Sequence, residues 1–131
     1  MRSACVLSFL LATAAVLQAP AADDKPLPPV EAIKKVNEKV TVQMEVKAAK
    51  NRLEKRGEIY LDSEEDFRDP KNLAVVVTRA GAAKFKEVGI DDPAEHFQGK
   101  LIRVTGIVIL KEGRPRIEVD EVKQIAIVVK K

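Results

Sequence analysis

The sequence has few of the residues that carry enzyme chemistry. Its 131 residues contain no tryptophan, one tyrosine, one histidine and one cysteine. Nucleophilic catalysis requires a base beside an activated hydroxyl or thiol, and past residue 21 the sequence has one histidine, His96, and one serine, Ser63. The ordinary interpretation of a lone loop histidine is a side chain bonded to nearby backbone. We therefore expect a binding protein with no catalytic residue rather than an enzyme.

The single cysteine, Cys5, lies in an N-terminal segment with the layout of a secretory signal. Arg2 precedes an apolar run from Ala4 to Leu17, and the small residues Ala19-Pro20-Ala21 follow. The run is shorter than the ~20 residues that span a membrane, and the small-residue triplet suits a signal peptidase. We expect residues 1–21 to be removed and the protein to be exported to the periplasm or the cell exterior; the alternative is an uncleaved N-terminal anchor. The mature protein would then have no thiol, disulfide or cysteine-based metal site.

Residues 22–36 are predicted to be a flexible lead-in. The stretch DDKPLPP, residues 23–29, is polar and rich in proline, which favours an unstructured chain. A short turn of helix is expected over residues 30–36. The remainder, residues 37–131, has room for a single domain.

Alternating apolar and polar residues predict the first two strands of this domain. From residue 39, the first strand places four apolar side chains on its buried face: Val40, Val42, Met44 and Val46. The second begins after Gly57, with Ile59 and Leu61 facing inward. The polar stretch between them, residues 47–57, is predicted to be a connection.

The next part of the chain changes from strand to helix. Residues 73–77 form a near-continuous apolar run, which is typical of a buried third strand. Residues 80–88 then have helical spacing, with Ala82, Phe85 and Val88 along one side, and Gly89 stands where helices commonly end. Residues 90–100 are predicted to be a loop.

Residues 101–119 are predicted to form the hairpin around which the domain is organised. Four alternating apolar residues follow the first arm: Ile102, Val104, Val108 and Leu110. Gly106 indicates a bulge or a sharp bend, and Glu112 and Gly113 supply the turn. Pro115 has no N–H for the ladder, so regular pairing is expected only from Arg116. A last strand is expected over residues 124–129.

This order of elements matches the OB-fold, a five-stranded Greek-key barrel with a helix between its third and fourth strands. The segments GEIYLDSE, DFRDPKNLAVVV, HFQGKLIRVTG and GRPRIEVDEVKQIAIV resemble those of OB-type domains that accompany bacterial nucleases and of anticodon-binding-like proteins. The resemblance covers residues 37–129 and implies an all-β domain with one short helix: a five-stranded OB-fold Greek-key barrel plus a C-terminal strand extension. It carries no catalytic residue. The expected core consists of Val42, Met44, Ile59, Leu61, Val75, Phe85, Val104, Val108, Ile117 and Val119.

Basic residues gather in the two connections that border the ligand face of an OB-fold. Ligands of this fold cross its second and third strands, flanked by the loops joining strands one to two and four to five. Both of those connections are basic here, whereas residues 62–72, between strands two and three, are acidic. Such segregation suits an anionic chain. The predicted binding site consists of Lys50, Arg52, Arg56, Tyr60, Lys111, Arg114 and Arg116.

The predicted ligand is single-stranded nucleic acid or another anionic polymer, bound weakly and mainly by charge. The net charge of +3 and a pI near 9.0 permit an anionic partner without requiring one; the alternative is that exposed loops simply gather lysines. Bases usually stack on exposed rings, and only Tyr60 falls on the expected face. Phe85 and Phe97 are expected to pack in the domain, and Phe67 suits either role.

Two other functions stay open on the sequence. The carboxylates of residues 62–69 could collect a hard cation such as calcium, but an EF-hand loop would need glycine where Phe67 stands and glutamate where Leu73 stands. We therefore predict a solvated acidic loop, no metal site and no cofactor, with a cation or small-ligand binder as the alternative. The remaining alternative is a protein-interaction module, resembling periplasmic OB-fold proteins of the envelope-stress kind.

Overall fold

The computed structural model describes residues 25–129. The expected signal peptide, residues 1–21, lies outside this part of the chain. Among the described residues, no helix is long and apolar enough to cross a membrane.

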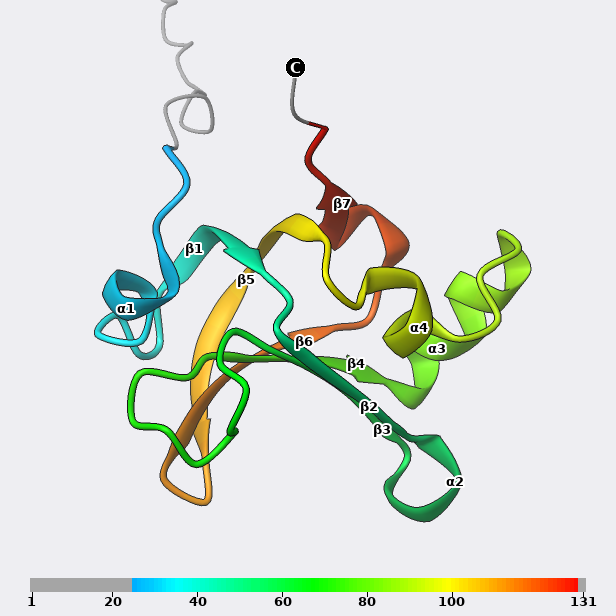
Figure 1. Ribbon diagram of the computed structural model, residues 1–131, viewed down its shortest axis with the longest axis horizontal. Coiled ribbons are helices and arrows are strands. Elements are labelled where there is room, and N and C mark those ends of the chain that lie inside the picture. Colours follow the sequence, from blue (N-terminus) through cyan, green and yellow to red (C-terminus); the bar gives the residue numbers. More distant parts are fainter. Residues whose placement is uncertain (1–24, 130–131) are drawn as a thin grey trace, which may run out of the picture.

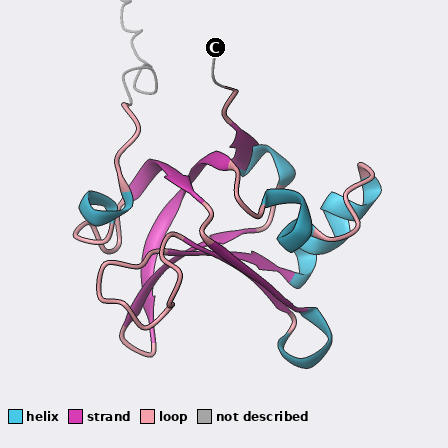
Figure 2. Cartoon of the chain, viewed as in Figure 1, coloured by secondary structure: helices cyan, strands magenta, loops and turns pink. Residues whose placement is uncertain are grey.

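A strongly curved sheet forms the centre of the described chain, and short helices flank it (Figures 1 and 2). The strands are β1 (Lys39–Glu45), β2 (Ala48–Arg52), β3 (Glu58–Asp62), β4 (Ala74–Thr78), β5 (Leu101–Lys111), β6 (Arg114–Val119) and β7 (Ile125–Ile127). The helices are α1 (Pro29–Ala32), α2 (Leu53–Arg56), α3 (Arg79–Glu87) and α4 (Pro93–Phe97), with a 3-10 turn, η3, at Val122–Gln124.

The strands pair in the order β1-β5-β6-β4-β3-β2, and β7 adds to β5. Only β4 and β6 run parallel; the other pairs are antiparallel. The two ends of this path, β1 and β2, follow one another in the chain and are separated only by Val46 and Lys47. The sheet is therefore a barrel whose hydrogen-bonded ladder is not closed, with β1 and β2 as two halves of one bent strand. With α3 and α4 between β4 and β5, this is the predicted OB-fold.

Residues 47–57, predicted to be a connection, instead contain β2 and α2. The whole of β2 pairs with β3, from Ala48 opposite Asp62 to Arg52 opposite Glu58. It stands at the end of the strand order and none of its residues is fully buried. A strand without a buried face has no apolar alternation, so the sequence pattern could not reveal it.

The N-terminal segment packs against the barrel from Leu27 onward. The Leu27 N–H donates to the Thr41 carbonyl at 2.8 Å, and its carbonyl accepts from the Gln43 N–H at 2.9 Å. Pro29 then begins α1, a position that the fixed φ of proline suits, and Ala32 is fully buried. Residues 27–29 are therefore ordered against the barrel and not a flexible lead-in, whereas the turn of helix expected over residues 30–36 is present as α1 but begins and ends earlier, at Pro29 and Ala32.

The inward faces of the predicted strands are confirmed. Every residue of the expected core is at most 3% exposed. The predicted helix is also present as α3, which begins at Arg79; its N-cap is Thr78, whose hydroxyl accepts from the Gly81 N–H at 3.1 Å. Val88, predicted to lie on the same side of the helix as Ala82 and Phe85, is 59% exposed, because the helix ends at Glu87 and its C-cap, Val88, departs from helical geometry.

A second helix, α4, replaces part of the predicted loop of residues 90–100. Asp92 caps it by accepting from the N–H groups of Ala94 at 3.0 Å and Glu95 at 3.4 Å. The Phe97 ring meets the Phe85 ring edge-on, with centroids 5.8 Å apart. Only five residues long, this helix is too short to produce a clear helical period.

The hairpin of β5 and β6 differs from its prediction in pairing. Glu112 and Gly113 both have positive φ, as a two-residue type I′ turn requires, and pairing starts at once with Lys111 opposite Arg114. Leu110 is 54% exposed, as expected for a residue near the hairpin tip beyond the core. The expectation of regular pairing only from Arg116 is therefore wrong.

Gly106 is needed for close packing and not for a bulge. The register of β5 with β1 passes through the pair Val40–Gly106 without an inserted residue. A Cβ at this position would lie 2.6 Å from Cγ2 of Ile117, which is closer than real side chains approach. Glycine therefore lets β5 pass over the core side chain of the neighbouring strand.

The final strand, predicted over residues 124–129, spans only Ile125–Ile127, and it begins one residue late because Gln124 belongs to the turn before it. Its side-chain oxygen accepts from the N–H groups of Asp120 at 2.8 Å and Glu121 at 3.0 Å. Its amide donates to the carbonyl groups of Thr105 and Glu118, each at 3.1 Å. Strand β7 begins only after this anchored turn.

Candidate functional site

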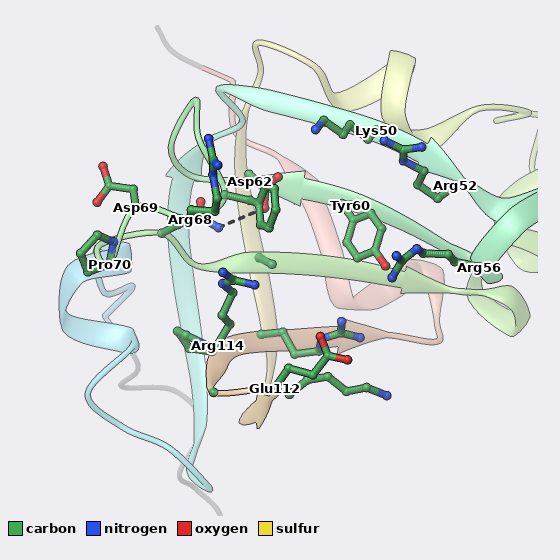
Figure 3. A pocket seen from close by; sticks show the side chains of 17 residues that line it. Lys50, Arg52, Arg56, Tyr60, Asp62, Arg68, Asp69, Pro70, Glu112 and Arg114 are labelled. Carbon is green, nitrogen blue, oxygen red and sulfur yellow. Dashed lines mark hydrogen bonds between the residues drawn. The ribbon is translucent and has the colours of Figure 1, made fainter.

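A groove crosses the outer face of β2, β3, β4 and β6. The register places Lys50 opposite Tyr60 and Ala74 opposite Arg116, so these side chains share one face of the sheet. The groove has a volume of about 690 Å³ and is bordered by α2, the loop of residues 63–73 and the tip of the β5–β6 hairpin (Figure 3). All seven residues of the predicted binding site line it: Lys50, Arg52, Arg56, Tyr60, Lys111, Arg114 and Arg116.

The structure places two of these cations differently from the prediction. Lys50 and Arg52 lie on strand β2 rather than in a loop, and only Arg56 comes from the short connection at α2 (Figure 3). Alternate residues of a strand point to the same side, which aligns Lys50 and Arg52 along one wall. Lys111 and Arg114 come from the hairpin, as expected.

Arg116 lines the groove but is already paired with carboxylates. Its side chain is only 11% exposed, and Nη1 lies 2.9 Å from Oε2 of Glu58 and 3.3 Å from Oε2 of Glu118. The Tyr60 hydroxyl donates to Oε1 of the same Glu58 at 2.6 Å. Arg116 therefore supports the floor of the groove rather than offering a free charge. No local pattern in the sequence marks Glu58 as part of the site, because its partner Arg116 lies 58 residues away in the chain.

These contacts determine the protonation states of Glu58 and Tyr60 in the floor of the groove. Burial raises the pKa of Glu58, but the hydrogen bonds from Tyr60 and Arg116 and the positive charges of Arg116 and Lys111 outweigh it, so the net pKa is lowered. The pKa of Tyr60 is raised by burial and by its bond to the Glu58 carboxylate. At neutral pH, Glu58 is therefore ionised and Tyr60 keeps its proton as the donor.

The lowered pKa of Glu58 makes part of the stability sensitive to acid. This contribution is present above the unfolded-state pKa and is lost as the pH falls through the lower folded-state pKa. We expect Arg116→Met to cost about 1–3 kcal/mol near pH 7, because it leaves Glu58 and Glu118 without their cation. The difference in unfolding free energy between wild type and variant should shrink below about pH 4.5. Urea unfolding of both proteins from pH 3 to 7 measures this, and a difference that is constant with pH would contradict it.

The loop of residues 63–73, predicted to be solvated, is exposed over most of residues 65–71 and forms one end of the groove. Its base is closed by buried polar groups: Asn72 Nδ2 donates to Asp62 at 3.1 Å, and the Leu73 N–H donates to the Ser63 hydroxyl at 2.9 Å. Asn72 also accepts from the Glu64 N–H at 2.9 Å. This network fixes where the loop stands against the groove.

The acidic residues of the loop are mostly engaged within the loop itself. Asp66 accepts from the Arg68 N–H at 2.9 Å and from its guanidinium at 3.0 and 3.1 Å, and Asp69 accepts from the Lys71 N–H at 2.9 Å. Of the loop's acidic residues only Asp69 lines the groove, together with Asp62 at the end of β3. Burial raises the pKa of Asp62 despite the opposing effects of Asn72 and Lys50. Among the described residues, no group of three or more His, Cys, Asp or Glu is placed to hold a metal ion.

Phe67 is an aromatic residue of the groove that the sequence could not assign. Its side chain is 43% exposed, and its ring centroid lies 5.5 Å from Nζ of Lys50 and 5.0 Å from Cζ of Arg114. Both distances are within the range of cation–π contacts. The sequence signal was an aromatic residue in the middle of a polar loop, but its direction depends on how the loop folds.

The groove has an excess of positive charge. Its lining contains seven Lys or Arg residues against three carboxylates. Arg68 and Arg116 are paired with carboxylates. Within residues 25–129, five lining cations have no ion pair with a carboxylate: Lys50, Arg52, Arg56, Lys111 and Arg114.

Solved structures with a similar fold come from aminoacyl-tRNA synthetases. A protein assigned as an aspartyl-tRNA synthetase of Leishmania major Friedlin matches 92% of this chain and 24% of its own, with a TM-score of 0.53 and 13% identity. The aspartyl-tRNA synthetase of Entamoeba histolytica has a TM-score of 0.49 with 16% identity, covering 88% of this chain and 24% of its own. The asparaginyl-tRNA synthetase of Pyrococcus horikoshii has a TM-score of 0.45 with 17% identity, covering 72% and 20%. No family model and no curated protein matches the chain.

At 13% identity, the likeness to the Leishmania protein shows the fold alone. The chain spans about a quarter or less of the length of each of the three synthetases. The class defined here is therefore an OB-fold domain with a basic groove on its ligand face.

Proposed function

We propose that the chain is an exported, non-catalytic OB-fold module that binds single-stranded nucleic acid, or another anionic polymer, weakly and mainly by charge. The observation that supports this most directly is the convergence of five cations without carboxylate partners on one groove. They come from β2, α2 and the β5–β6 hairpin, which are separate parts of the chain. The groove lies on the face where OB-folds bind oligonucleotides.

The size and chemistry of the groove fit a flexible polyanion. Its cations lie on both walls, and Tyr60 lies between them on the floor (Figure 3). Two rings, Tyr60 and Phe67, are few for a high-affinity binder of single strands, in which each stacked base adds ~1–3 kcal/mol. The Leishmania protein of similar fold is named for tRNA, a nucleic acid, which agrees with the proposal.

The salt dependence of binding should give the number of phosphate contacts. Three to five contacts from the five cations predict that log affinity falls with log salt at a slope of about 2 to 4, at about 0.7 per phosphate. Fluorescence anisotropy with an oligo(dT) at several salt concentrations measures it. Tyr60→Ala should lower affinity and leave the slope unchanged, because stacking releases no counterions. No binding even at low salt, where attraction is strongest, would reject nucleic acid and favour a protein partner.

Export is the part of the proposal that rests on the sequence of residues 1–22. Cleavage after Ala21 should leave a thiol-free protein of about 110 residues. The intact mass of the protein recovered from its native host measures this. A full-length species that retains Cys5 would contradict it.

A further inference from the structure

Phe67 connects the two walls of the groove. Lys50 belongs to β2 and Arg114 to β6, and two strands, β3 and β4, lie between β2 and β6 in the sheet. The Phe67 ring lies within 5.5 Å of Lys50 Nζ and 5.0 Å of Arg114 Cζ. Figure 3 shows Lys50 and Arg114 on opposite sides of the groove. One ring therefore contacts cations from both walls.

The position of this ring is built by the loop that carries it. On either side of Phe67, Asp66 and Arg68 are joined by three hydrogen bonds of 2.9 to 3.1 Å. The base of the loop is held by the bonds between Asn72 and Asp62 and between Leu73 and Ser63. A ring that is 43% exposed on such an anchored loop is held at the groove rather than buried for stability.

The two cations that hold the ring are also cations that an anionic ligand needs. Lys50 and Arg114 have no carboxylate partner among the ion pairs of the described residues. Charge-assisted hydrogen bonds to phosphate are stronger than cation–π contacts at an exposed site. Phosphates that enter the groove would therefore draw both cations away from the ring.

We infer that Phe67 is a base-stacking residue, which Lys50 and Arg114 hold in the free protein and release to an unpaired base when phosphates engage them. This inference rests on the proposed function and narrows its ligand. A polyanion without bases makes contacts only with the cations of the groove. A single strand with exposed bases contacts these cations and also stacks a base on the Phe67 ring, so it is the preferred ligand.

The test compares an oligo(dT) with inorganic polyphosphate of matched charge, using the chain from residue 22 to 131. Phe67→Ala should weaken oligo(dT) binding roughly 5- to 150-fold, because the stacked base is lost. The same variant should bind polyphosphate equally well or more tightly, because the ring no longer competes for the cations. Phe67→Tyr, which keeps a ring, should retain oligo(dT) binding. Ile107→Ala, which removes a 53% exposed apolar side chain outside the groove, is the control and should change neither affinity.

The possible results show whether the inference fails alone or together with the proposed function. Equal weakening for both ligands would make Phe67 a structural support, and no change for either would mean that the ring does not stack; both results overturn the inference. Polyphosphate binding without oligo(dT) binding would overturn it while leaving the anionic-polymer function in place. If neither ligand binds the unaltered protein, both the function and the inference fail.

A spectroscopic readout follows from the absence of tryptophan in the chain. Phe67→Trp introduces the only indole, at the position where the base is inferred to stack. Oligo(dT) should quench its fluorescence through contact with the base, whereas polyphosphate should not. Equal responses to both ligands, or no response to oligo(dT), would overturn the inference.

Discussion

Replacing Arg52 and Arg114 together by alanine should weaken binding of a single-stranded oligonucleotide by roughly 60-fold at about 50 mM salt. Removing two phosphate contacts lowers the slope of log affinity against log salt by about 1.4, and this change corresponds to roughly 60-fold between about 1 M and 50 mM salt. The two arginines come from β2 and the hairpin, so the double variant tests both walls at once. Anisotropy titrations over a range of salt concentrations give the affinity and the slope.

The matched control removes two positive charges elsewhere. Lys86 and Lys123 are exposed and do not line the groove, so Lys86→Ala with Lys123→Ala changes the net charge equally. If the groove is the binding site, this control should change the affinity by far less and leave the slope almost unaltered. Equal losses for the two double variants would mean that binding depends on net charge and not on the groove.

Replacing Phe85 by alanine should lower the free energy of unfolding by about 3–5 kcal/mol, the cost of deleting a large aromatic side chain from a core. Phe85 is 1% exposed and joins helix α3 to Phe97 of α4 through an edge-on ring contact. A small domain has a total stability of about 5–15 kcal/mol, so this single change removes a large part of it. Urea unfolding followed by circular dichroism measures the loss.

Val88→Ala is the control for this change. Val88 follows the same helix, and the sequence pattern placed it beside Phe85, but it is 59% exposed. We expect its replacement to change stability by no more than about 0.5 kcal/mol, as is usual for surface substitutions. A large loss from Val88→Ala, or a loss below about 1 kcal/mol from Phe85→Ala, would contradict the packing described for α3.

Part of the basic groove could be predicted from the sequence. Knowledge of the OB-fold was enough to place Lys111 and Arg114 beside its ligand face, and the structure brings them into one groove with Arg52. Arg116 shows the limit. Its neutralisation by Glu58 and Glu118 is a tertiary contact, and a count of basic residues cannot distinguish a paired arginine from an unpaired one.

The sequence by itself determined which faces of the main strands are buried. Residues such as Val42, Ile59 and Val104 recur at every second position because a strand with one face on the core must alternate. That local rule was enough for the fold class. It failed at β2, which is an edge strand without a fully buried residue, and at Val88, which lies past the end of its helix.

Only the tertiary structure decided what the groove offers to a ligand. The direction of Phe67 depends on a loop closed by Asn72 and Asp62, and its cation contacts come from strands on opposite sides of the groove. The availability of each charge likewise depends on partners far along the chain, such as Glu58 for Arg116. Burial patterns repeat locally and can be recognised in a sequence, whereas pairings between distant side chains arise only when the sheet curls and brings them together.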